Sequence, residues 1–177
     1  MISSALDLLR GLALALAASI AMAQTPAPPK PPPCRAAEHR QFDFWLGRWD
    51  VFTADGKKAG ENVIEPIDGG CALQERWRGN GGFSGTSLNT WSRDTRQWHQ
   101  HWIDNQGGLL RLAGGLEGKS MVLSGAQPHP GRAGATQRHR ITWTPLPDGA
   151  VRQWWQSSDD DGATWTTAFD GRYVRQR

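Results

Sequence analysis

The chain has 177 residues and a net charge of +3, with 20 basic residues, mostly arginine, interspersed with 17 acidic ones. Because no run of basic residues interleaves with aromatic side chains, this composition argues against nucleic-acid binding. No apolar stretch is long enough to span a membrane as a helix, and the length suits one domain.

The amino-terminal residues have the pattern of an export signal. Arg10 precedes an apolar run that ends in Ala21-Met22-Ala23, which predicts a secretory signal peptide over residues 1–23. Residues 24–33 are dominated by proline and predict an extended leader, so the folded domain is expected over residues 34–177. We therefore expect a periplasmic or secreted protein, and nothing in the sequence points to an obligate protein partner.

The stretch RQFDFWLGRWDVF, residues 40–52, predicts a short aromatic helical plug that turns at Gly47 into a first strand. Further strand-like runs separated by turn signals follow at 62–67, 71–78, 85–92, 97–104, 109–116, 120–124, 138–144, 151–157 and 164–175. About ten short strands in one domain predict an all-β fold, a single antiparallel up-and-down barrel whose closure removes exposed strand edges. A β-sandwich is the alternative.

The two cysteines, Cys34 and Cys71, form an even pair in a chain that we expect to be exported. This predicts a disulfide, which for a loop of this length contributes about 3–4 kcal/mol in the chain-entropy description. No metal site is predicted, because His39 is the only histidine close to either cysteine in sequence.

Ten tryptophans distinguish the composition, and we expect most to form core or barrel wall while a few line a ligand cavity. In the run 97–104, alternation places Trp98, Gln100 and Trp102 on one face and two histidines on the other. Burying two indoles stabilises the fold by more than exposing two imidazoles destabilises it, so the indole face is expected to point into the barrel. Trp98 and Trp102 would then contact a ligand that Gln100 orients. If the histidine face pointed inward, His99 and His101 could bind a metal or act as acid and base.

Glu75 and Trp77 share one face of the run 71–78, and we expect both at the ligand site. In a cavity the pKa of Glu75 would rise, and with a histidine it could act as general acid or base in a hydrolase, isomerase or lyase. A carboxylate paired with an arginine is the commoner outcome. No nucleophile elbow, phosphate-cradling loop or zinc motif is present, so no catalytic residue is assigned and enzyme activity stays open.

Residues 158–165, SDDDGATW, resemble the Asp-box hairpin of sialidases and other β-propeller proteins. The resemblance implies a structural role, in which Asp160 caps turn amides, Gly162 adopts a positive φ and Trp165 packs beneath the turn. Propellers repeat their blades and this motif occurs once, so glycosidase activity does not follow. The spacing of the three aspartates also matches no known calcium loop.

Gly47-Arg48-Trp49 resembles the G-x-W signature of the lipocalins and the wider calycin group. The resemblance implies that Trp49 closes the barrel floor and that an arginine of the last strand, Arg172 or Arg175, packs across it. The segments FDFWLGRWDV, GGCALQERW, GFSGTS and QWHQHWID resemble a group of secreted bacterial calycin-like proteins.

At the level of fold the chain is also similar to the nitrobindins, ten-stranded barrels that bind haem through a histidine. The candidate ligands here are His99, His101 and His139, and none lies in a motif that specifies this role. Since fold does not imply function, no cofactor is predicted and haem is an alternative.

These observations lead to the hypothesis of an exported barrel that binds a small apolar or aromatic molecule in a Trp-lined cavity. Such a site needs a cavity of about 300 Å³ or more. The alternatives are a barrel enzyme with an interior Glu/His pair, a haem binder, and a non-catalytic envelope interaction protein. The last predicts an exposed patch of Trp and Arg in place of a cavity.

Overall fold

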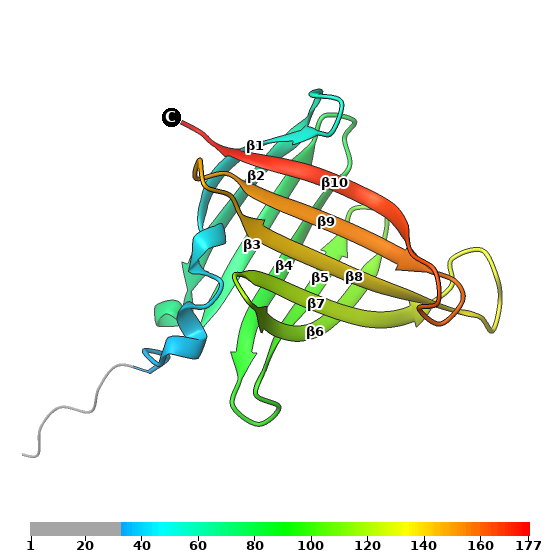
Figure 1. The fold of residues 1–177 in the computed structure, drawn as a ribbon, viewed down its shortest axis with the longest axis horizontal. Helices are drawn as coiled ribbons and strands as arrows, with labels where there is room; N and C mark the ends of the chain where they lie inside the picture. Colours follow the sequence, from blue (N-terminus) through cyan, green and yellow to red (C-terminus); the bar gives the residue numbers. More distant parts are fainter. Residues whose placement is uncertain (1–32) are drawn as a thin grey trace, which may run out of the picture. The chain divides into compact units, whose positions relative to one another are not determined.

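The computed structural model describes residues 33–177, so the predicted signal peptide and all but the last residue of the predicted leader lie outside the described residues. Ten strands form one closed antiparallel barrel in which each strand pairs with the next and β10 returns to β1 (Figure 1). The strands are β1 (Gly47–Thr53), β2 (Lys58–Ile67), β3 (Ala72–Gly79), β4 (Ser84–Ser92), β5 (Gln97–Asp104), β6 (Leu109–Glu117), β7 (Ser120–Pro128), β8 (Thr136–Pro145), β9 (Val151–Ser158) and β10 (Thr166–Arg175). The predicted ten-stranded barrel is confirmed, and the β-sandwich alternative is wrong.

The barrel interior follows the period-2 alternation of the strands. In β1 the buried residues are Trp49 and Val51, and across the closing seam Val51 lies opposite Tyr173 of β10. A bulge between Thr167 and Phe169 shifts the register of β10 against β9, which changes which residues of β10 point inward beyond that point.

Two short 3₁₀ helices, η1 (Ala37–Arg40) and η2 (Asp43–Trp45), form the predicted plug at the end of the barrel where β1 begins (Figure 1). Phe42 and Trp45 are completely buried and stack with ring centroids 4.9 Å apart. Phe42 also meets Trp98 of β5 and Trp143 of β8 edge-on, at 5.6 and 5.2 Å. These contacts fill this end of the barrel with aromatic side chains, which confirms the predicted plug.

Gly47 allows the chain to turn from the plug into β1. Its φ of +140° is a conformation that L side chains rarely adopt, and a Cβ there would lie 2.6 Å from Nη1 of Arg175. The indole nitrogen of Trp49 then donates a hydrogen bond back to the Trp45 carbonyl at 2.9 Å. The strand and the plug are thus joined by a buried hydrogen bond.

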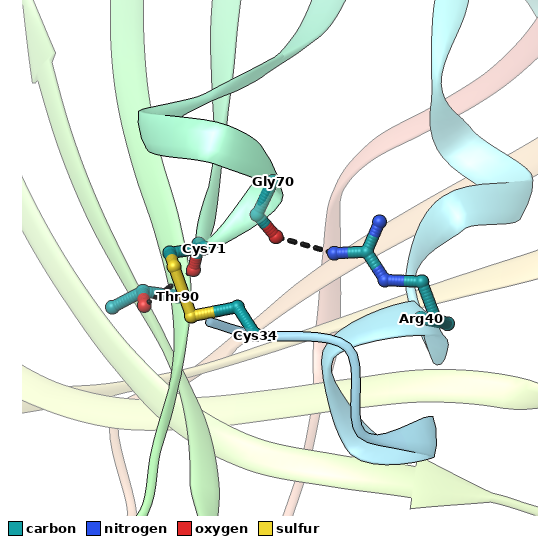
Figure 2. Close-up of a disulfide and its surroundings, with 5 residues drawn as sticks. All are labelled: Cys34, Arg40, Gly70, Cys71 and Thr90. Atoms are coloured by element: carbon teal, nitrogen blue, oxygen red, sulfur yellow. Dashed lines mark hydrogen bonds between the residues drawn. A yellow bond between two sulfur atoms is a disulfide. The ribbon is translucent and has the colours of Figure 1, made fainter. Parts of the chain in front are cut away.

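The predicted disulfide between Cys34 and Cys71 is confirmed, with an S–S distance of 2.05 Å (Figure 2). It links the segment before the plug to the residue just before β3. Two hydrogen bonds support it, one from Arg40 to the Gly70 carbonyl in the short helix η3 (Asp68–Gly70) and one from Thr90 Oγ1 to the Cys71 carbonyl at 3.0 Å. Within residues 33–177 there is no helix of the length and apolarity needed to cross a membrane.

Candidate functional site

A cavity of about 220 Å³ lies inside the barrel, away from the plug. One of its lining residues, Phe83, belongs to the turn between β3 and β4, which is at the opposite end of the antiparallel barrel from the start of β1. Phe83 is 38% exposed. The cavity therefore opens at the end that the plug leaves uncovered.

Aromatic side chains form the wall of this cavity: Trp77, Phe83, Trp102, Trp155 and Phe169. The indole nitrogen of Trp102 donates to Asp104 Oδ2 at 3.4 Å, and that of Trp155 donates to His139 Nδ1 at 3.1 Å. Neither acceptor belongs to the cavity lining. Because these two N–H groups are bonded elsewhere, the indoles offer the cavity apolar ring surface.

Two glycines make room for this wall. A Cβ on Gly85 would lie 2.2 Å from the Trp102 ring, and one on Gly171 would lie 2.4 Å from the Phe169 ring. Both distances are far below van der Waals contact, so any larger residue would displace the ring. The aromatic wall is therefore positioned by the absence of neighbouring side chains on β4 and β10.

The floor of the cavity is polar and contains the buried carboxyl group of Glu75, whose side chain comes from β3. Ser87 Oγ donates to Glu75 Oε2 at 2.6 Å, and Asn62 Nδ2 donates to Oε1 at 2.7 Å. Burial raises the pKa of Glu75, while these two hydrogen bonds act in the opposite direction. The result is a carboxyl group in a low-dielectric site with both oxygens already accepting hydrogen bonds.

The donors around Glu75 form a directed chain. Asn89 Nδ2 donates to Ser87 Oγ at 2.9 Å, and Gln100 Nε2 donates to Asn89 Oδ1 at 3.0 Å. Since the Ser87 oxygen accepts from Asn89, its single proton is free to point at Glu75. Side chains from β4 and β5 thus support the charged form of a carboxyl group on β3.

Tyr173 and Gln153 complete the floor. The Tyr173 hydroxyl donates to Gln153 Oε1 and accepts from Asn62 Nδ2 at 3.3 Å. Burial, together with the nearby negative charge of Glu75, raises the pKa of Tyr173 well above its usual value. Tyr173 therefore stays neutral at physiological pH.

Four of the five residues predicted for ligand binding meet in this cavity, namely Glu75, Trp77, Gln100 and Trp102. The fifth, Trp98, faces inward as alternation predicted, but it packs against the plug. Its indole nitrogen donates to the Glu38 carbonyl and to Gln41 Oε1, both at 3.2 Å. Three residues of extended strand lie between it and Trp102, so the two indoles lie at different levels of the barrel.

Of the two arginines considered for packing across Trp49, Arg175 takes this position and Arg172 does not. The Arg175 guanidinium lies 4.4 Å from the Trp49 ring centroid, and its Nη1 donates to the Leu46 carbonyl at 3.1 Å. Arg172 instead pairs with Asp148 at the surface. The register explains the difference, because Arg175 is the residue of β10 opposite Trp49.

The Asp-box-like segment forms the hairpin between β9 and β10. Asp160 accepts hydrogen bonds from Thr164 Oγ1 at 2.5 Å, from the Thr164 amide at 2.8 Å and from Ser158 Oγ at 2.7 Å, and these bonds lower the pKa of Asp160 to about 2. Gly162 has a φ of +94°, and its carbonyl accepts from the Trp165 indole at 3.0 Å. These contacts all lie within the turn itself. No group of three or more potential metal ligands occurs among residues 33–177.

No histidine reaches Glu75, whose side-chain hydrogen bonds within the described part of the chain come from Ser87 and Asn62. His99 contacts Thr95 on the outside of the barrel and His101 is exposed, so the alternative with the histidine face inward is wrong. The interior acid-base pair required by the enzyme hypothesis is therefore not formed.

Sequence reasoning missed three important cavity residues, Gln153, Trp155 and Tyr173. Alternation through Val151, Gln153 and Trp155 carried the signal for the first two, because Val151 is an apolar residue at the start of a strand. For Tyr173 the signal was the alternation of Phe169, Gly171 and Tyr173 with Asp170 and Arg172, which lies after the bulge in β10.

The fold and the site together define a closed ten-stranded antiparallel barrel with an aromatic-walled, polar-floored internal cavity. A comparison of the chain with models of known protein families finds no match, and neither does a comparison with curated proteins.

Proposed function

We propose that this protein binds one small aromatic or apolar molecule in the barrel cavity. The observation that carries the proposal is the lining itself, in which apolar rings surround a few convergent polar groups. This combination is typical of small-molecule sites, where the apolar wall supplies affinity and the polar groups fix orientation. Gln100 orients the ligand, and Trp77 and Trp102 contact it.

The size of the cavity restricts the ligand. Its volume of about 220 Å³ is below the minimum of about 300 Å³ that the sequence hypothesis set, so that size expectation is wrong and the proposal is restricted to ligands smaller than the drug-sized molecules to which the minimum applies. An apolar cavity of about 150 Å³ holds benzene, so one ring with a short substituent is the appropriate size. A porphyrin is several times larger, and the described lining residues include no histidine to bind its iron, so we do not propose haem as the ligand.

A calycin-like identity and an exported location are part of the same proposal. The closed antiparallel barrel is compatible with a calycin-like fold, and the disulfide favours an oxidising compartment such as the periplasm or the medium. The cavity favours ligand binding over the envelope interaction hypothesis, which expected none.

A first test is native mass spectrometry, paired with an ultraviolet–visible spectrum, on protein purified from a bacterial periplasm without refolding. A bound mass that disappears on denaturation supports a carrier. A Soret band would instead identify haem and contradict the proposed ligand class.

A second test uses calorimetric titration with benzyl alcohol. Trp102→Ala removes a cavity wall and should weaken binding about threefold to tenfold, the range expected for one aromatic contact. Trp154→Ala is the matched control, because Trp154 is not among the cavity residues and its indole nitrogen donates to Thr167 Oγ1 at 3.1 Å on the exposed side of the β9–β10 strand pair. Equal effects of the two variants, or no binding to the unmodified protein, would contradict the proposal.

A further inference from the structure

The cavity can carry a negative charge but no positive one. Among its described lining residues the ionisable groups are Glu75 and Tyr173, and no lysine, arginine or histidine is present. Tyr173 stays neutral, as described above. The net charge of the lining is therefore zero or minus one, depending only on Glu75, and a negatively charged ligand would meet no compensating charge.

The hydrogen-bonding groups left for a ligand are acceptors on Glu75 and Gln100 and an amide donor on Gln153. The hydrogen bonds of Ser87, Asn62 and the Gln100 amide nitrogen are directed within the floor, and the Tyr173 hydroxyl donates to Gln153. The Gln153 amide nitrogen, for which the described residues supply no acceptor, is left to donate, whereas the Gln100 carbonyl oxygen and the remaining lone pairs of Glu75 are left to accept. A ligand that donates hydrogen bonds satisfies these acceptors, whereas a ligand that only accepts leaves them unpaired.

The aromatic wall of the cavity also favours a cation. The faces of aromatic rings carry negative electrostatic potential, and cages of such rings bind ammonium groups, with Trp the strongest partner. Trp102 and Trp155 have their N–H groups bonded outside the cavity, so the edges that would repel a cation are turned away from it.

From this arrangement we infer that the ligand is a compact organic amine in its cationic form, with its ammonium group held between Glu75 and the indole faces of Trp77, Trp102 and Trp155. The inference rests on the proposed function and narrows it from small aromatic molecules to small aromatic or alkyl amines. The carboxylate and the rings recognise the same charge from two directions, and the apolar wall accommodates the rest of the molecule.

Binding of such a ligand is coupled to the ionisation of Glu75. The neighbours that face Glu75 from β2, β4 and β5 are the uncharged Asn62, Ser87 and Gln100, and the titratable neighbour is Tyr173 of β10. Burial raises the pKa of Glu75. An ammonium group favours the carboxylate, so binding at a pH below this raised pKa releases a proton to solvent, and amine affinity rises with pH until Glu75 is fully ionised.

The test compares benzylamine, benzyl alcohol and benzoate, which share one ring and one size but carry charges of plus one, zero and minus one at neutral pH. Calorimetric titrations of the full exported protein are expected to give benzylamine at least about fivefold tighter than benzyl alcohol, with benzoate weakest. In buffers of different ionisation enthalpy, benzylamine binding should show proton release. Equal or tighter binding of benzyl alcohol or benzoate overturns the inference.

Glu75→Gln keeps the shape of the side chain and removes its charge. The ratio of benzylamine to benzyl alcohol affinity should fall towards one, and the proton release should disappear. A ratio unchanged from the unmodified protein overturns the inference, and if the variant does not fold, the three-ligand series alone decides. If benzyl alcohol binds and benzylamine does not, the amine inference is refuted and the proposed function stands. If none of the three ligands binds, the amine inference and the proposed function are both refuted.

Discussion

Breaking the disulfide tests how much the covalent link between the plug segment and the barrel contributes to the free energy of unfolding. Cys34 and Cys71 are separated by 37 residues, and in the chain-entropy description a loop of this length stabilises the folded state by about 4 kcal/mol. The double variant Cys34→Ser/Cys71→Ser should lose about that much free energy of unfolding. The loss arises mainly in the unfolded chain, which regains the freedom that the crosslink removes.

Urea denaturation followed by tryptophan fluorescence measures this change. Chemical reduction of the unmodified protein is the control, and it should shift the unfolding midpoint as far as the two substitutions do. Benzyl alcohol should still bind, because the cavity lies away from the plug. A loss below about 1 kcal/mol would refute the reasoning, since the unfolded state would then already hold these segments together.

Three further outcomes follow. Glu75 has a raised pKa when folded, so it contributes stability that is complete below its unfolded pKa and is lost as pH rises through the folded value. Thermal unfolding followed upward from about pH 4 should show this decline, and Glu75→Gln should lack it. Gly85→Ala should displace the Trp102 ring, which lowers the free energy of unfolding by about 1–3 kcal/mol and weakens benzyl alcohol binding. Gly115→Ala is the control, because it has open space around it and should change neither quantity in the same urea denaturation and calorimetric titration. Arg175→Met should lower the free energy of unfolding by about 0.5–1 kcal/mol in urea denaturation, because it removes the cation that lies over the Trp49 ring. An unchanged free energy of unfolding would mean that this cation–π contact does not stabilise the fold.

The barrel and part of the cavity were predictable from sequence because they depend on local rules. Alternation along a strand fixes which side chains share a face, so Glu75 with Trp77 and Gln100 with Trp102 were correctly grouped, and the run of aromatics before Gly47 predicted the plug. The even cysteine count in a chain with an export pattern predicted the disulfide.

The cavity residues that sequence reasoning missed or misplaced depend on how the strands are placed against one another. Alternation does not tell at which level of the barrel an inward residue lies, so Trp98 was assigned to the cavity although it packs against the plug. The bulge between Thr167 and Phe169 interrupts the alternation near the start of the last strand, so the inward face could not be carried through from its first residues to Tyr173. The choice between Arg172 and Arg175 depends on the register of β10 against β1, which places Arg175 opposite Trp49. Polar donors such as Ser87 and Asn62 gave no signal of their own.

The seam between β1 and β10 has a consequence for how the protein is made. It pairs the first strand with the last, with Trp49 opposite Arg175, so the barrel cannot close until the whole domain has been synthesised (Figure 1). Contacts this distant in sequence slow folding. Until they form, β1 and β9 present unpaired edges that can join other chains. A chain cut short before β10 should therefore aggregate rather than fold into a smaller barrel.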